Sequence, residues 1–162
     1  PWHSSKSRRY RGGPRVAPGT YTVRLTVGEE VQEQSFNLML DPRSESTGIT
    51  VADVAKQETL ALQMVELLSE VRKMKEELQN KQQKLSKQQT ELSEAEKQEL
   101  ATVEKALEQL ETEEGTYMKP MLEAQISYLY YIVTGSDQSP GNDASGRYQE
   151  LKKQFEAMAQ DD

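Results

Sequence analysis

Apolar residues recur at alternating spacings of three and four between Ile49 and Leu92, the longest periodic stretch of the chain. The repeating positions are Met64, Leu67, Val71, Met74, Leu78 and Leu85, with Lys81 at one heptad position. This spacing places them on one side of an α-helix, like the seam of a coiled coil or long helical hairpin. The pattern predicts a helix from Asp53 to about Lys84, about 45 to 50 Å long at 1.5 Å per residue. Other segments or another chain must cover its seam.

Residues 19 to 40 follow a period of two, which is typical of β-strands. Tyr21, Val23, Leu25 and Val27 alternate with polar residues, and Phe36, Leu38 and Leu40 do the same after a turn at Gly28-Glu29-Glu30. Asp41-Pro42 ends the second strand. We expect a β-hairpin with one apolar face. Two strands alone are marginal in water, so missing strands, the helices or a second copy must cover that face.

The apolar pattern fades over residues 79 to 91, which would leave the far end of the long helix, about Gln79 to Thr90, bare. Ser93-Glu94-Ala95-Glu96 is a capping box and marks a new helix start. We therefore predict a turn near residues 86 to 93 and a second, antiparallel helix from Glu94 to about Glu113, with Gly115 after it. One uninterrupted helix that pairs between chains is the alternative.

Two shorter helices complete the pattern. A third helix begins around Pro120 and should be the most buried, and its inner side carries Met118, Leu122, Ile126, Leu129, Ile132 and Val133. After a loop at residues 135 to 142, Asp143 or Ser145 caps a last helix with Tyr148, Leu151, Phe155 and Met158.

The predicted fold class is therefore mainly α with a small β part. An N-terminal β-hairpin precedes a long antiparallel helical hairpin that is thickened into a bundle of three or four helices. The domain organisation that we predict is a basic flexible arm at 1–18, the β-hairpin at 19–43, and the helical hairpin and bundle at 49–162.

Charge is distributed unevenly along the chain. The net charge is −7, yet no acidic residue precedes Glu29, and a basic cluster surrounds Tyr10. That cluster could bind phosphate, but a solvated linker is the simpler interpretation. The acidic remainder argues against a nucleic-acid partner for the helical part. No apolar run reaches the roughly 18 to 20 residues that span a membrane.

The residue types that carry most catalytic chemistry are scarce. The chain has no cysteine, and its single histidine is His3 in the arm, which argues against thiolate or histidine metal sites and histidine acid–base catalysis. Carboxylates such as Glu76 and Glu77 lie among lysines, without an apolar pocket to raise a pKa. No phosphate-binding glycine loop is present. We expect no catalytic residue, no cofactor and no metal in this chain.

Tyr128, Tyr130 and Tyr131 form an aromatic cluster on the third helix. Three tyrosines within four residues cannot share one helix face, so at least one should lie outward. They are our candidate partner-binding residues. The alternative is that they pack in the core with their hydroxyl groups reaching solvent.

Several motifs resemble one known protein region. Ala17-Pro18-Gly19-Thr20-Tyr21-Thr22-Val23-Arg24-Leu25, Leu40-Asp41-Pro42-Arg43, the stretches 125–130 and 137–144, and Arg147-Tyr148-Gln149-Glu150-Leu151 carry the likeness. Over residues 16 to 160 the chain resembles the C-terminal region of bacterial secreted sortilin-like β-propeller proteins, often labelled glycosyl hydrolases with BNR repeats. The resemblance implies that the hairpin forms the last strands of an immunoglobulin- or fibronectin-like sandwich. It also implies a secreted or periplasmic location.

The function that we expect is a noncatalytic interaction or scaffolding module, a C-terminal appendage of such a propeller protein. Its partner would be protein, either the upstream domains of its parent or a second copy in a homodimer. One alternative is a coiled-coil chaperone of the prefoldin or nucleotide-exchange type. Another is a fragment of a glycoside hydrolase whose active site lies outside this chain.

Overall fold

The computed structural model describes residues 13–87 and 92–160, so most of the predicted basic arm, residues 1–12, lies outside the described residues. An antiparallel hairpin of two strands is followed by a mainly helical region, which confirms the predicted fold class. The elements are β1 Gly19–Val27, β2 Glu30–Leu38, α1 Pro42–Ser46, α2 Val51–Ser86, α3 Glu94–Leu110, α4 Leu122–Thr134 and α5 Ala144–Gln160.

The hairpin closes through a two-residue loop, Gly28-Glu29, because Val27 pairs with Glu30. Gly28 has a φ of 62°, whereas Glu29 is not among the residues with positive φ, which matches a type II′ turn. One face of the hairpin is polar and carries cross-strand contacts. Thr22 Oγ1 lies 3.1 Å from Ser35 Oγ, and Arg24 Nε lies 2.5 Å from Glu33 Oε1.

The second strand ends at Leu38, two residues before the predicted Leu40. Leu38 pairs with Gly19, the first residue of β1, so Met39 and Leu40 have no partner in the described sheet. The Asp41 side chain then caps the short helix α1 by accepting a hydrogen bond from the Arg43 backbone N–H at 2.9 Å. Pro42 then occupies the first helical position, where its missing N–H costs nothing.

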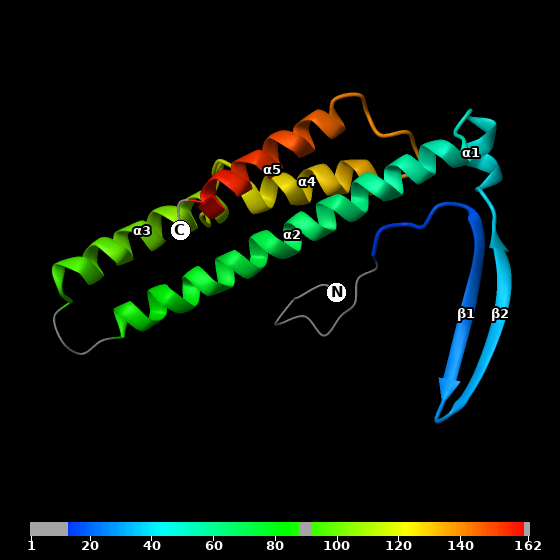
Figure 1. Cartoon of the computed structure of the whole chain (residues 1–162). Coiled ribbons are helices and arrows are strands. Elements are labelled where there is room, and N and C mark those ends of the chain that lie inside the picture. The colour runs from blue at the N-terminus through cyan, green and yellow to red at the C-terminus, as the bar shows by residue number, and fades with distance from the viewer. Residues whose placement is uncertain (1–12, 88–91, 161–162) are drawn as a thin grey trace.

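Helix α2 is the longest described element and packs against α3, α4 and α5. It has 36 residues, which corresponds to about 54 Å. Its start is fixed by a capping box in which Thr50 Oγ1 accepts from the Asp53 N–H at 3.2 Å and Asp53 Oδ2 accepts from the Thr50 N–H at 3.1 Å. Figure 1 shows α3 along the far half of α2, and α4 and α5 along the half nearer the hairpin.

Helix α3 begins where the capping box of Ser93 and Glu96 predicts, with the Ser93 N–H donating to Glu96 Oε2 at 2.8 Å. It runs antiparallel to α2: Lys81 contacts Glu99, whereas Gln79, which comes earlier in α2, contacts Glu111, which comes later in the chain. The alternative of one uninterrupted helix is therefore wrong. Residues 88–91 of the predicted turn lie outside the described residues. The helix ends at Leu110, earlier than the predicted Glu113.

The seam of α2 is buried within the same chain. Its fully covered side chains pack against the other helices in one cluster, which includes Met64, Leu68, Val71, Leu110, Leu122, Ile126, Leu151 and Phe155. The seam continues to Leu78 and Leu85, which are 3% and 8% exposed. The prediction of a bare far end from Gln79 is thus wrong at Leu85, whereas residues 79 to 84 are exposed or half-buried.

Candidate functional site

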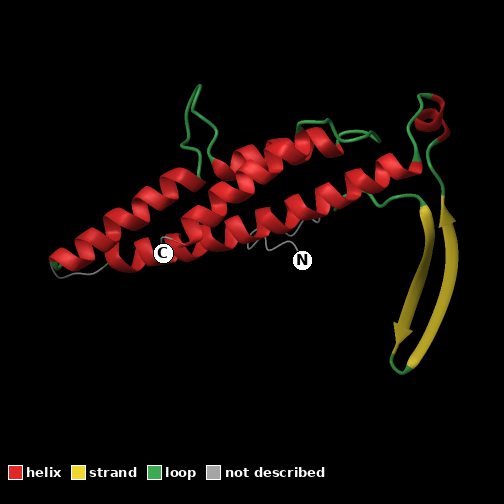
Figure 2. Cartoon of the chain, turned by 45° about the horizontal axis from the view of Figure 1, so that its top comes forward, coloured by secondary structure: helices red, strands yellow, loops and turns green. Residues whose placement is uncertain are grey.

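The first candidate surface is the hairpin apolar face, which we define as Tyr21, Val23, Leu25, Val27, Phe36 and Leu38. Val23, Leu25 and Val27 are 57%, 60% and 66% exposed. Figure 2 shows the hairpin standing away from the helices, so the helices do not cover it. The sequence predicts that missing strands, the helices or a second copy cover this face. Within the described residues, the helices do not.

Both hairpin strands present a free edge. The described sheet has two strands, so each strand has main-chain groups on its outer side that no third strand pairs. Neither strand contains lysine or proline, which often protect an edge from further pairing, although β1 carries Arg24 and β2 carries Glu30 and Glu33. An uncovered apolar face beside free edges is typical of a surface that binds another sheet or strand.

The second candidate surface is the tyrosine cluster on α4, which the structure splits. Tyr128 and Tyr131 are 67% and 72% exposed, whereas Tyr130 packs against the core. Burial raises the pKa of the Tyr130 hydroxyl, in agreement with that position. Core packing is therefore right for Tyr130 and wrong for the other two tyrosines.

As predicted, helix α4 has the smallest share of exposed residues among α2, α3, α4 and α5, although Tyr128, Tyr131 and Ile132 are exposed. Ile132, which was expected on the inner side, is 48% exposed. The helix buries the side that faces α2, with Leu122, Ile126 and Val133, and no described element covers its outer side. The sequence pattern could not show this, because all sides of the helix carry bulky apolar or aromatic residues.

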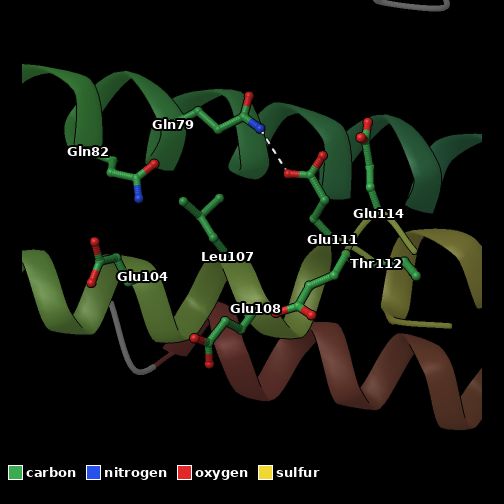
Figure 3. Close-up of a pocket in the computed structure, with 9 residues that line it drawn as sticks. Gln79, Gln82, Glu104, Leu107, Glu108, Glu111, Thr112 and Glu114 are labelled. Carbon is green, nitrogen blue, oxygen red and sulfur yellow. Dashed lines mark hydrogen bonds between the residues drawn. The ribbon is translucent and has the colours of Figure 1, made fainter. Parts of the chain in front are cut away.

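The third candidate surface is an acidic cleft beside the α2–α3 pair, with a volume of about 470 Å³. Figure 3 shows Leu107 pointing toward α2, and glutamates around it. The lining residues are Gln79, Gln82, Glu104, Leu107, Glu108, Glu111, Thr112, Glu113 and Glu114. Gln79 Nε2 donates to Glu111 Oε2 at 3.0 Å, and this hydrogen bond links α2 to the C-terminal end of α3. The remaining carboxylates face solvent, as on an ordinary charged helix surface.

Where carboxyl pKa values shift in the described residues, they shift downward. The side chain of Arg43 lowers the pKa of Asp41 to about 2, and hydrogen bonds from Thr50 lower the pKa of Asp53. Burial alone would raise the pKa of Glu123, but the cations of Lys75 and Arg72 outweigh it and lower that pKa. Lowered values keep these groups ionised, whereas a general acid needs a raised pKa.

Two further properties bear on chemistry in the described residues. Among residues 13–87 and 92–160, no group of three or more histidine, cysteine, aspartate or glutamate side chains could hold a metal ion. No described helix combines the length and hydrophobicity that crossing a bilayer requires.

Sequence reasoning missed the polar residues that hold the loop after α4 against α2 and against the segment before β1. Gln57 is 3% exposed, and its Nε2 donates to the backbone oxygens of Val133 at 2.5 Å and Ser136 at 2.6 Å. Asp137 contacts Arg15. No short-range signal could reveal either residue, because the partners are far away in the sequence.

Comparison of the chain with protein-family models, curated proteins and solved structures finds no match.

Proposed function

We propose that this chain is a noncatalytic interaction module that binds another protein through its β-hairpin. The uncovered hairpin apolar face carries the proposal. Burial of apolar area stabilises by about 25 cal/mol per Å², so several exposed valine and leucine side chains on one face are a strong incentive for association.

The size of the face indicates what kind of partner fits. A nine-residue strand is about 30 Å long and two strands are about 10 Å wide, so the face offers about 300 Å². A stable interface buries about 800 Å² on each partner. Two copies meeting face to face through their hairpins would fall short of that. A partner sheet that also pairs with a free edge would bury more and add main-chain hydrogen bonds.

The two strands differ in a way that suits such a sheet. Every residue of β1 on the apolar face after Gly19 is apolar, whereas β2 places Glu30, Gln32 and Gln34 on the same face near the tip. In a larger sheet, β1 would therefore suit a central position and β2 an edge. We propose that the partner is an immunoglobulin- or fibronectin-like sandwich in a secreted or periplasmic propeller parent. The resemblance of residues 16 to 160 to the C-terminal region of such proteins supports this assignment.

The test measures whether the hairpin apolar face binds an apolar ligand and which side chains are responsible. We expect the chain to bind a hydrophobic fluorescent dye. The double substitution Val23→Thr with Leu25→Thr should reduce dye binding severalfold, because threonine is polar but, being β-branched, still suits a strand. The matched control, Thr22→Ser with Thr26→Ser, changes the polar face and should bind the dye like the unmodified chain. Equal dye binding by both variants would contradict the proposal.

Two further measurements separate the alternatives. Light scattering after size exclusion should show a monomer, because α3, α4 and α5 cover the α2 seam; a hexamer or a seam-dependent dimer would favour the chaperone. An assay of glycan hydrolysis should show no activity, and turnover would favour the hydrolase fragment.

A further inference from the structure

One carboxylate contacts both chain segments that flank the hairpin, the one before β1 and the one after β2. Asp137 Oδ1 lies 2.6 Å from Nη1 of Arg15, which precedes β1. Asp137 Oδ2 accepts a hydrogen bond of 3.4 Å from Ser44 Oγ in α1, which follows β2. We call Arg15, Ser44 and Asp137 the Asp137 junction. The Asp137 side chain is only 19% exposed, so the junction is partly shielded from solvent.

The loop that carries Asp137 is itself anchored on α2. Gln57 binds the carbonyl oxygens of Val133 and Ser136, and its neighbour Glu58 accepts a 2.9 Å hydrogen bond from the backbone N–H of Ala17. Two consecutive residues of α2 therefore hold the loop and the segment before β1. The anchored loop gives Asp137 a fixed position from which it can orient the hairpin.

Few other contacts restrain the hairpin. Neither strand packs extensively on a helix in the described part of the chain. The connection from β2 to α2 contains Gly48 with a φ of 87°, a conformation that favours glycine. Figure 2 shows the hairpin projecting away from the helices.

We infer that the Asp137 junction sets the angle between the hairpin and the helices, and that losing it lets the hairpin swing while the helices stay folded. The consequence for binding rests on the proposed function: a hairpin held at one angle presents its apolar face already ordered, which lowers the entropic cost of docking. Release of the junction would weaken docking without changing the apolar face.

The angle can be measured without a partner. The chain has no cysteine, so Glu29→Cys at the hairpin tip and Glu76→Cys on α2 provide two unique spin-label sites. Double electron–electron resonance should give one narrow distance distribution. In Asp137→Ala, we expect the population outside the main peak to rise about fivefold, the factor that corresponds to about 1 kcal/mol for a part-exposed ion pair. Circular dichroism should show unchanged helicity.

Matched variants keep the inference testable. Arg15→Gln removes the ion pair from the other side and should broaden the distribution in the same way, even if Asp137→Ala disturbs its loop. Glu150→Gln removes an exposed ion pair on α5, 2.8 Å from Arg147, and should leave the distribution unchanged. An unbroadened distribution in Arg15→Gln, or one as broad in the unmodified chain, would overturn the inference. Neither result depends on whether the hairpin binds a partner, so the proposed function is judged separately.

Discussion

Replacing Glu123 by glutamine should destabilise the helical region, because this carboxylate joins α4 to the middle of α2. Its Oε1 accepts from Arg72 Nε at 2.7 Å, and its Oε2 contacts Lys75 Nζ at 2.5 Å. The side chains of Arg72, Lys75 and Glu123 are 29%, 20% and 20% exposed, so water screens the pairs only in part. Glu123 also lies in the first turn of α4, where the helix dipole favours a negative charge.

The magnitude follows from the two contacts that change. A hydrogen bond to a charged group contributes about 1.5 to 3 kcal/mol, and partial exposure reduces that value. Glutamine keeps one oxygen for Arg72 but turns an NH₂ group toward the ammonium of Lys75. We expect a loss of about 2 kcal/mol in the free energy of unfolding, which lowers the melting temperature by about 4 to 8 °C for a chain of this size.

The stabilisation that Glu123 provides should decrease in acid. Burial opposes the lowering of the Glu123 pKa, but Lys75 and Arg72 prevail, so the folded pKa lies below the ordinary value of 4.5. A lowered folded pKa means that the stabilisation is complete above that ordinary value and is lost as the pH falls through the folded pKa. The free energies of unfolding of the two proteins should therefore differ at pH 7 and converge in acid.

Urea denaturation followed by circular dichroism at pH 7 and in acid tests this reasoning. Glu150→Gln is the matched control, because the Glu150 side chain is 68% exposed and its ion pair stays within α5. The control should change the free energy of unfolding by less than about 0.5 kcal/mol. If Glu123→Gln changed the free energy of unfolding at pH 7 no more than the control does, the packing of α4 on α2 would not depend on this carboxylate.

Two more perturbations probe the helices. Val71→Asp places a carboxylate at a position that is 0% exposed in the core, so we expect several kcal/mol of destabilisation and a clear loss of helicity on heating; an unchanged melt would mean that the seam is exposed in solution. Met74→Pro should cost about 3 kcal/mol or more, since it breaks α2 beside the core, whereas Gln82→Pro lies near the helix end at Ser86 and should cost less in the same melting experiment. Equal damage from the two prolines would show that the end of α2 supports the fold as strongly as its middle.

The elements that the sequence predicts well depend on residues close together in the chain. The capping box of Ser93 and Glu96 involves residues three positions apart, and it correctly separates α3 from α2. The hairpin follows from alternation and from Gly28, whose positive φ suits a two-residue turn. The end of α3 was less predictable, because no strong stop signal lies at Leu110.

The candidate surfaces were only partly predictable. The apolar face of the hairpin is visible in the alternation from Tyr21 to Val27, but its lack of cover depends on where the helices pack. The tyrosines on α4 show the same limit: the sequence requires that at least one points outward, and packing on α2 decides that Tyr130 turns inward while Tyr128 and Tyr131 remain exposed.

The sequence by itself determined the types and order of the elements and the stripe that α2 buries, because helix periodicity, strand alternation and capping act over a few residues. The predicted helical hairpin and bundle already imply that other helices of the same chain cover this stripe, and the tertiary structure confirms that α3, α4 and α5 do so. Only the tertiary structure brought Gln57 to Val133, Asp137 to Arg15, and Glu123 to Arg72. Those contacts join residues at least 51 positions apart, so they exist only once packing has brought the helices together.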